Sequence, residues 1–84
     1  MEVKVLRINV VENIKDVKAF VDISYGGLII NGLKIVDGKE GRFVAYPQVK
    51  GKDGNYHSIV KAGDIETKDT IEKYILEQYN NRIK

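Results

Sequence analysis

The spacing of apolar residues changes once along this chain, from a period of two to a period of about four. Between residues 17 and 25 every second residue is apolar, which is typical of a β-strand with one buried face. After Gly63, the apolar residues Ile71, Ile75 and Tyr79 recur four positions apart in a stretch without Gly or Pro, which predicts an amphipathic helix. Strands followed by one helix are expected to form an α+β domain.

An antiparallel β-sheet of four to five strands is predicted ahead of the C-terminal α-helix, because turn residues divide this part of the chain into short apolar runs. The expected strands are residues 3–10, 17–25, 28–38, 41–47 and 55–60. The apolar residues of the first strand change parity at Val5–Leu6, which predicts either a bulge there or a strand that is covered on both faces. Pro47 cannot donate a ladder hydrogen bond, so it should end the fourth strand or lie at a sheet edge.

The third of these strands is interrupted by a glycine. Its alternation predicts that Ile29, Leu33 and Ile35 share one face. Gly32 lies between them and has no side chain to pack, so it is expected to mark a bend or a bulge.

The chain length of 84 residues predicts a single domain spanning residues 1–84. A domain of this size buries only about 60% of the surface that its unfolded form exposes, which favours homo-oligomerisation. With no cysteine and one histidine, His57, a disulfide framework is excluded and a zinc or copper site is not expected, so no cofactor is predicted. No segment resembles a signal peptide or a membrane span, so a soluble cytoplasmic protein is expected.

Positive charge is concentrated in the middle of the chain. Residues 39–61 carry five basic and two acidic side chains, whereas residues 1–38 are balanced and residues 62–84 have a slight acidic excess. Such an excess attracts phosphate backbones or acidic protein surfaces, although a solvated lysine-bearing hairpin has the same composition. Tyr46 and Tyr56 flank the basic segment, where they either stack on unpaired bases or fill a small core.

The start of the predicted helix is a second candidate anion site. Lys68 follows Thr67 in the first turn, where unpaired backbone N–H groups and the helix dipole favour an anion. The same turn contains Asp64, Glu66 and Asp69, which are the residues of an ordinary capped helix, with Asp64 or Thr67 as the N-cap. These residues alone leave both interpretations open.

The sequence shows no catalytic arrangement. His57 and Ser58 are neighbours in a predicted strand, so their side chains point to opposite faces and are poorly placed to share a proton. Asp37, Glu40 and Asp53 lie in predicted turns, where Asp commonly bonds its own backbone. We therefore predict a protein that is not an enzyme and has no small-molecule substrate.

Residues 29–60, IINGLKIVDGKEGRFVAYPQVKGKDGNYHSIV, closely resemble the signature of the SpoVG family, small bacterial proteins named for septation and sporulation. The matching elements are Asn31, Ile35–Gly38, Gly41, Phe43–Ala45, Pro47, Lys50, Lys52, Asp53–Gly54 and Tyr56. The start MEVKVLRINVV and the later segment IEKYILEQY also match, so the resemblance covers essentially the whole chain.

The resemblance implies an antiparallel sheet with a C-terminal helix, a homodimer, and a regulator that binds DNA and, in some members, RNA. It also implies nucleic-acid contacts at the beginning of the helix, where Thr67 and Lys68 occupy the family's Ser/Thr and basic positions, with Lys in place of the usual Arg. The predicted contact residues are Arg42, Lys50, Lys52, Lys61, Thr67 and Lys68. The alternative is a protein-interaction module of the division or sporulation machinery that docks a partner through a sheet edge or the tyrosine-bearing surface.

Overall fold

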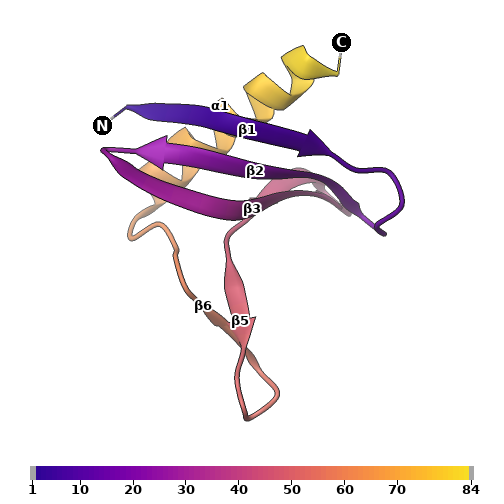
Figure 1. Cartoon of the computed structure of the whole chain (residues 1–84), viewed down its shortest axis with the longest axis vertical. Helices are drawn as coiled ribbons and strands as arrows, with labels where there is room; N and C mark the ends of the chain where they lie inside the picture. Colours follow the sequence, from indigo (N-terminus) through magenta and orange to yellow (C-terminus); the bar gives the residue numbers. More distant parts are fainter. Residues whose placement is uncertain (1, 84) are drawn as a thin grey trace.

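The computed structural model describes residues 2–83. They form a four-stranded antiparallel sheet, a separate two-stranded hairpin and one C-terminal helix, which confirms the predicted α+β class (Figure 1). The elements are β1 Val3–Val10, β2 Val17–Tyr25, β3 Leu28–Gly38, β4 Gly41–Ala45, β5 Gln48–Lys50, β6 Tyr56–Ser58 and α1 Ile65–Arg82. The main sheet has the order β1-β2-β3-β4, so β1 and β4 are its edges.

The core lies between one face of the main sheet and α1, which crosses behind the sheet in Figure 1. Alternate residues of β2 and residues four apart in α1 supply its centre, as the two periodicities predict. The buried residues are Val3, Ile8, Ala19, Val21, Ile23, Leu33, Ile35, Val44, Ile71, Ile75 and Tyr79. Within residues 2–83 no polar or charged residue is fully buried, so the core is held together by apolar contacts.

Of the two alternatives predicted for the parity change in β1, the structure has the bulge. Val5 pairs with Ile23 and Arg7 pairs with Asp22, which leaves Leu6 between them without a partner in β2. The extra residue explains why the apolar residues of β1 change parity at this point.

A second bulge lies at Gly32 in β3, as expected. Two residues of β3, Asn31 and Gly32, lie opposite Asp22 of β2. Gly32 has a φ of +82°, a conformation that residues with a Cβ rarely adopt, and its backbone N–H donates a hydrogen bond of 3.0 Å to Asp22 Oδ1.

The prediction that Ile29 shares the face of Leu33 and Ile35 is wrong, and the bulge is the reason. The extra residue shifts the alternation by one position, so Ile30 pairs with Ile23 and packs against the core. Ile29 is consequently 64% exposed, whereas Leu33 and Ile35 are completely buried.

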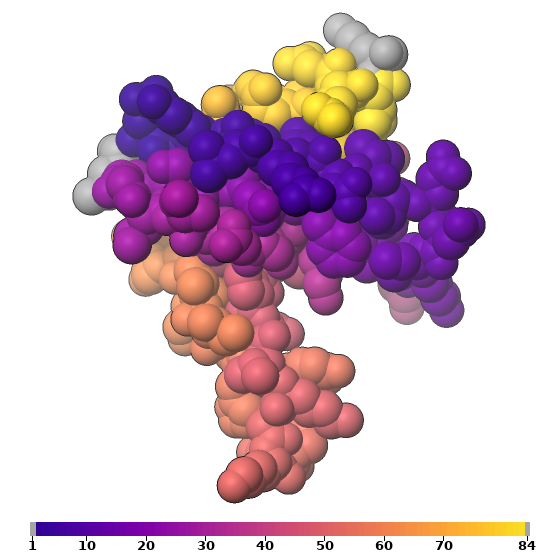
Figure 2. All heavy atoms as spheres, in the orientation of Figure 1, coloured from indigo at the N-terminus to yellow at the C-terminus, as the bar shows by residue number. Residues whose placement is uncertain are grey.

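Residues 48–58 form a hairpin that projects from the main sheet (Figures 1 and 2). β5 and β6 pair only with each other, and all six of their residues are exposed. The predicted fifth strand therefore exists, but it is shorter than residues 55–60 and its partner, β5, was not predicted. Pro47 separates β4 from β5, and its carbonyl accepts the Ile59 N–H at 3.1 Å at the base of the hairpin.

The projecting hairpin makes the molecule elongated, with extents of 41 Å along the longest axis and 23 Å along the shortest. In the part of the chain that the structure describes, no helix is long and apolar enough to span a bilayer.

Candidate nucleic-acid interface

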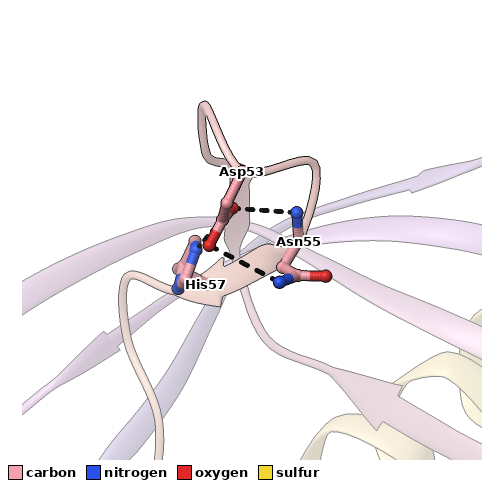
Figure 3. Close-up of polar contacts among 3 residues, drawn as sticks. All are labelled: Asp53, Asn55 and His57. Carbon is pink, nitrogen blue, oxygen red and sulfur yellow. Dashed lines mark hydrogen bonds and ion pairs between the residues drawn. The ribbon is translucent and has the colours of Figure 1, made fainter.

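The turn of the projecting hairpin is organised by one carboxylate (Figure 3). Asp53 Oδ1 accepts the backbone N–H of Asn55 at 3.0 Å and lies 3.2 Å from His57 Nε2. The Asn55 side-chain amide is 3.5 Å from the other carboxylate oxygen. These contacts, the Asn55 N–H first and His57 second, hold the pKa of Asp53 below its usual value. Asp53 bonds its own backbone, as its position in a turn predicts.

Gly51 lies close to the side chains of this turn. A Cβ added at Gly51 would lie 2.8 Å from the His57 ring and 2.9 Å from Asp53 Oδ1, closer than atoms can approach without displacement. The Gly51 N–H donates to the Asn55 carbonyl at 2.8 Å and closes the turn. The His57 side chain therefore has a structural contact within the hairpin, with Asp53 as its partner.

Three of the six predicted contact residues are exposed cations on the hairpin and the segment that follows it. Lys50 ends β5, Lys52 lies in the turn, and Lys61 lies between β6 and α1. Within residues 2–83, no carboxylate lies close enough to form an ion pair with any of the three. Their ammonium groups are therefore available to an anionic partner.

Arg42, by contrast, is engaged within the fold. Its Nε donates a hydrogen bond of 2.8 Å to Asp37 Oδ1, and its guanidinium carbon lies 5.3 Å from the centre of the Tyr79 ring. Lys18 Nζ approaches the same carboxylate at 3.5 Å. The hydrogen bond from Arg42 is the largest cause of the lowered pKa of Asp37.

Lys68 is also partly engaged. Its Nζ lies 3.7 Å from Glu72 Oε2, and the same oxygen accepts the backbone N–H of Val44 at 3.2 Å. β4 is an edge strand, so an N–H that points away from β3, as this one does, needs an acceptor from outside the sheet. Glu72 thus joins α1 to β4, and Lys68 lies beside this connection.

The first turn of α1 is capped by Asp64 rather than by Thr67. Asp64 has an extended backbone, and its Oδ1 accepts the Thr67 N–H at 2.7 Å. This hydrogen bond lowers the pKa of Asp64. A phosphate at the helix start would compete with this carboxylate for the Thr67 N–H, and Glu66 lies on the same shallow hollow.

The six predicted residues therefore fall into two groups. Lys50, Lys52 and Lys61 are exposed and free of ion pairs among the described residues. The other three, Arg42, Thr67 and Lys68, already make contacts that stabilise the fold. Charge counting along the sequence cannot separate these groups, because the partners of Arg42 and Lys68 are known only once β4 and α1 are placed.

A groove of about 210 Å³ lies where the hairpin leaves the main sheet. It is lined by residues of β3, of the segment after β4, and of the hairpin, including Asn31, Lys34, Tyr46, Pro47, Gln48 and Tyr56. Asn31, Lys34 and Gln48 were not predicted as site residues. The nearest signal in the sequence was the pair of tyrosines that flank the basic segment.

The two tyrosines have different environments. The Tyr46 ring packs against the core, and its hydroxyl is buried without a hydrogen-bond partner among the described residues. Burial, with the negative charge of Glu72 as a second cause, raises the pKa of Tyr46. Tyr56 is 67% exposed on the hairpin. Of the two, Tyr56 is the tyrosine that a ligand can reach.

Comparison with known proteins gives a consistent result. The SpoVG family model matches residues 1–81. The chain is 32% identical to a protein of Agathobacter rectalis named as a septation protein SpoVG, over 99% of this chain and 97% of that protein. It is 30% identical to the protein of the same name in Caldicellulosiruptor bescii, over 94% of this chain and 91% of the relative. The protein of the same name in Clostridium perfringens is 29% identical over a similar span.

Proposed function

Because this chain belongs to the SpoVG family, we propose that it is a homodimeric cytoplasmic regulator of septation and sporulation that binds DNA or RNA and is not an enzyme. The septation role is supported by the names of the relatives. Nucleic-acid binding is supported by one observation above all: Lys50 and Lys52 on the exposed hairpin, and Lys61 just after it, form no ion pair within residues 2–83. A projecting hairpin with cations at its end and base offers them to a phosphate backbone without a need to break existing ion pairs.

Lys50, Lys52 and Lys61 are the primary phosphate contacts in this proposal. Arg42, Thr67 and Lys68 are secondary, because each must first give up a contact within the protein. A side chain that must first leave an ion pair gains less binding free energy from a phosphate than a lysine that has no such pair.

Dimerisation is supported by the exposure of large apolar side chains on a small domain. Leu28, Ile59 and Ile65 are 70%, 63% and 75% exposed. A second copy that covers such surface would stabilise the fold by about 25 cal/mol for each Å² removed from water. It would also double the three free lysines, and with them the number of phosphates that one particle can neutralise. Sedimentation should then give a particle of twice the 9.5 kDa chain mass.

The test of nucleic-acid binding is a titration of fluorescent duplex DNA, single-stranded DNA and RNA at several salt concentrations. With about six phosphates neutralised by a dimer, affinity should fall by about 10³ between 50 and 200 mM salt. Affinity that stays flat across this range would contradict the proposal and favour the protein-interaction alternative.

A further inference from the structure

Lys50 and Tyr56 are paired directly across the projecting hairpin. Cross-strand partners place their side chains on the same face, so a cation and a largely exposed aromatic ring lie side by side. Gln48 is two residues from Lys50 and shares this face, whereas Val49 and His57 occupy the opposite one. The face that carries Tyr56 is the one that turns toward the groove.

The opposite wall of the groove comes from the main sheet. β3 contributes Asn31, at its bulge, and Lys34, which pairs with Ala45 of β4. Within residues 2–83, the side chains of Asn31, Lys34 and Gln48 make no hydrogen bond or ion pair. Two amides and one ammonium group, all unpaired, therefore line a hollow that an exposed tyrosine also borders.

The size and composition of the groove restrict what it can hold. Its volume of about 210 Å³ is below the 300–1,000 Å³ that is usual for sites of drug-sized ligands. It is suited to a single flat ring system. Tyr56 offers a stacking surface, and the amides of Asn31 and Gln48 offer both donors and acceptors to a ring edge. Positive charge comes from Lys34 in the lining and from Lys50, the cross-strand partner of Tyr56.

We propose that this groove binds one unpaired nucleobase, which stacks on Tyr56 while Lys34 and Lys50 contact the phosphates that flank it. The inference deepens the proposed nucleic-acid binding and rests on it. It adds that the protein prefers unpaired strands to duplexes, because a base inside a duplex is stacked on its neighbours and has no free face for Tyr56.

Abasic oligonucleotides separate this inference from the proposed function, because they keep the phosphates and lack the bases. We expect the wild-type protein to bind a single-stranded oligonucleotide about five- to 150-fold more tightly than an abasic strand of the same length, with both measured at the same salt concentration. Tyr56→Ala should remove this difference and leave abasic binding unchanged, whereas Tyr56→Phe should keep it. Val49→Ala, on the opposite face of the hairpin, is the matched control and should behave as wild type.

The possible failures are distinguishable. If neither oligonucleotide binds the wild-type protein, the proposed function itself is wrong. If both bind equally well, or if Tyr56→Ala weakens both to the same degree, nucleic-acid binding stands and the nucleobase site is refuted.

A fluorescence measurement provides a direct check that does not depend on affinity. The chain has no tryptophan, so Tyr56→Trp introduces a single reporter at the groove. Its emission should be quenched by the base-containing strand and not by the abasic strand. If the base-containing strand binds and the emission does not change, the assignment is wrong.

Discussion

The carboxylate of Glu72 on α1 accepts the backbone N–H of Val44 on β4 at 3.2 Å. These residues are 28 positions apart in the chain, and their contact attaches the helix to the edge strand that leads into the hairpin. The Val44 side chain is 4% exposed and faces the core, so the same residue joins the sheet to the helix through both its side chain and its backbone.

Removal of this acceptor should destabilise the fold. Glu72→Ala leaves the part-buried Val44 N–H unpaired, and we expect the free energy of unfolding to fall by about 1–3 kcal/mol. Glu72→Gln should cost less, because its amide oxygen still accepts. Urea denaturation measures both, with the exposed Glu77→Ala on the same helix as the control. Equal unfolding midpoints for Glu72→Ala and Glu77→Ala would contradict the role of this hydrogen bond.

Stability should decline in acid because three carboxyl groups have lowered pKa values in the folded state. Asp37 is held ionised chiefly by Arg42, Asp53 by the Asn55 N–H, and Asp64 by the Thr67 N–H. Their contribution is fully present above the unfolded pKa of about 3.9 and is lost as the pH falls through the folded values. The melting temperature, followed from pH 7 to pH 2.5, should therefore drop below about pH 4. Asp37→Asn should flatten this drop, and an unchanged pH profile would refute the contribution of Asp37.

The N-cap of α1 can be tested at neutral pH. Asp64→Ala removes the acceptor for the Thr67 N–H, and we expect the melting temperature to fall by about 4–8 °C. Asp64→Asn should be nearly neutral, since Asn is an equally good N-cap residue. A similar loss in both variants would indicate that the negative charge, rather than the hydrogen bond, is what the helix start requires.

The elements of the core could be predicted from the sequence because their signals are local. The alternation in β2 and the repeat of Ile71, Ile75 and Tyr79 each specify a buried face without knowledge of any other element. The face of Ile29 in β3 was predicted incorrectly. The glycine at position 32 indicates a possible bulge, but the effect of the bulge on the alternation of side chains depends on how β3 pairs with β2.

The candidate site was less accessible to sequence reasoning because it is assembled from distant segments. β5 has only three residues, too few for a periodic signal, and its partner β6 is equally short. The groove joins Asn31 and Lys34 to Tyr56, which are more than 20 positions apart. Composition located the basic segment, but it could not show that Arg42 is paired with Asp37 while Lys50 has no ion pair within residues 2–83.

The hairpin turn should be sensitive to added volume at Gly51. Gly51→Ala places a methyl group 2.8 Å from the His57 ring, so the ring or the turn must shift. Because the hairpin makes its own small sheet, we expect NMR chemical-shift changes confined to residues 48–58, weaker nucleic-acid binding and a nearly unchanged melting temperature. Gly63→Ala is the matched control, since a Cβ there meets nothing within 4 Å. Equal binding by the two variants would show that the turn geometry is irrelevant to the interface.

The two groups of cations should differ in what their removal changes. Lys50→Ala with Lys52→Ala should reduce the slope of log affinity against log salt on duplex DNA, by about 0.9 for each phosphate that the variant no longer neutralises. The same variant should have little effect on stability, because neither lysine forms an ion pair within residues 2–83. Arg42→Ala should instead lower the stability and have little effect on the salt slope, because it breaks the hydrogen bond to Asp37 and the contact with the Tyr79 ring.

The control for this comparison is Lys4→Ala with Lys73→Ala, which removes the same charge from exposed positions on β1 and α1. If the control flattens the salt dependence as much as the hairpin variant, binding responds to net charge alone. If only the hairpin variant flattens the salt dependence, its lysines contact phosphates directly, because long-range attraction is screened within about 10 Å at 0.1 M salt.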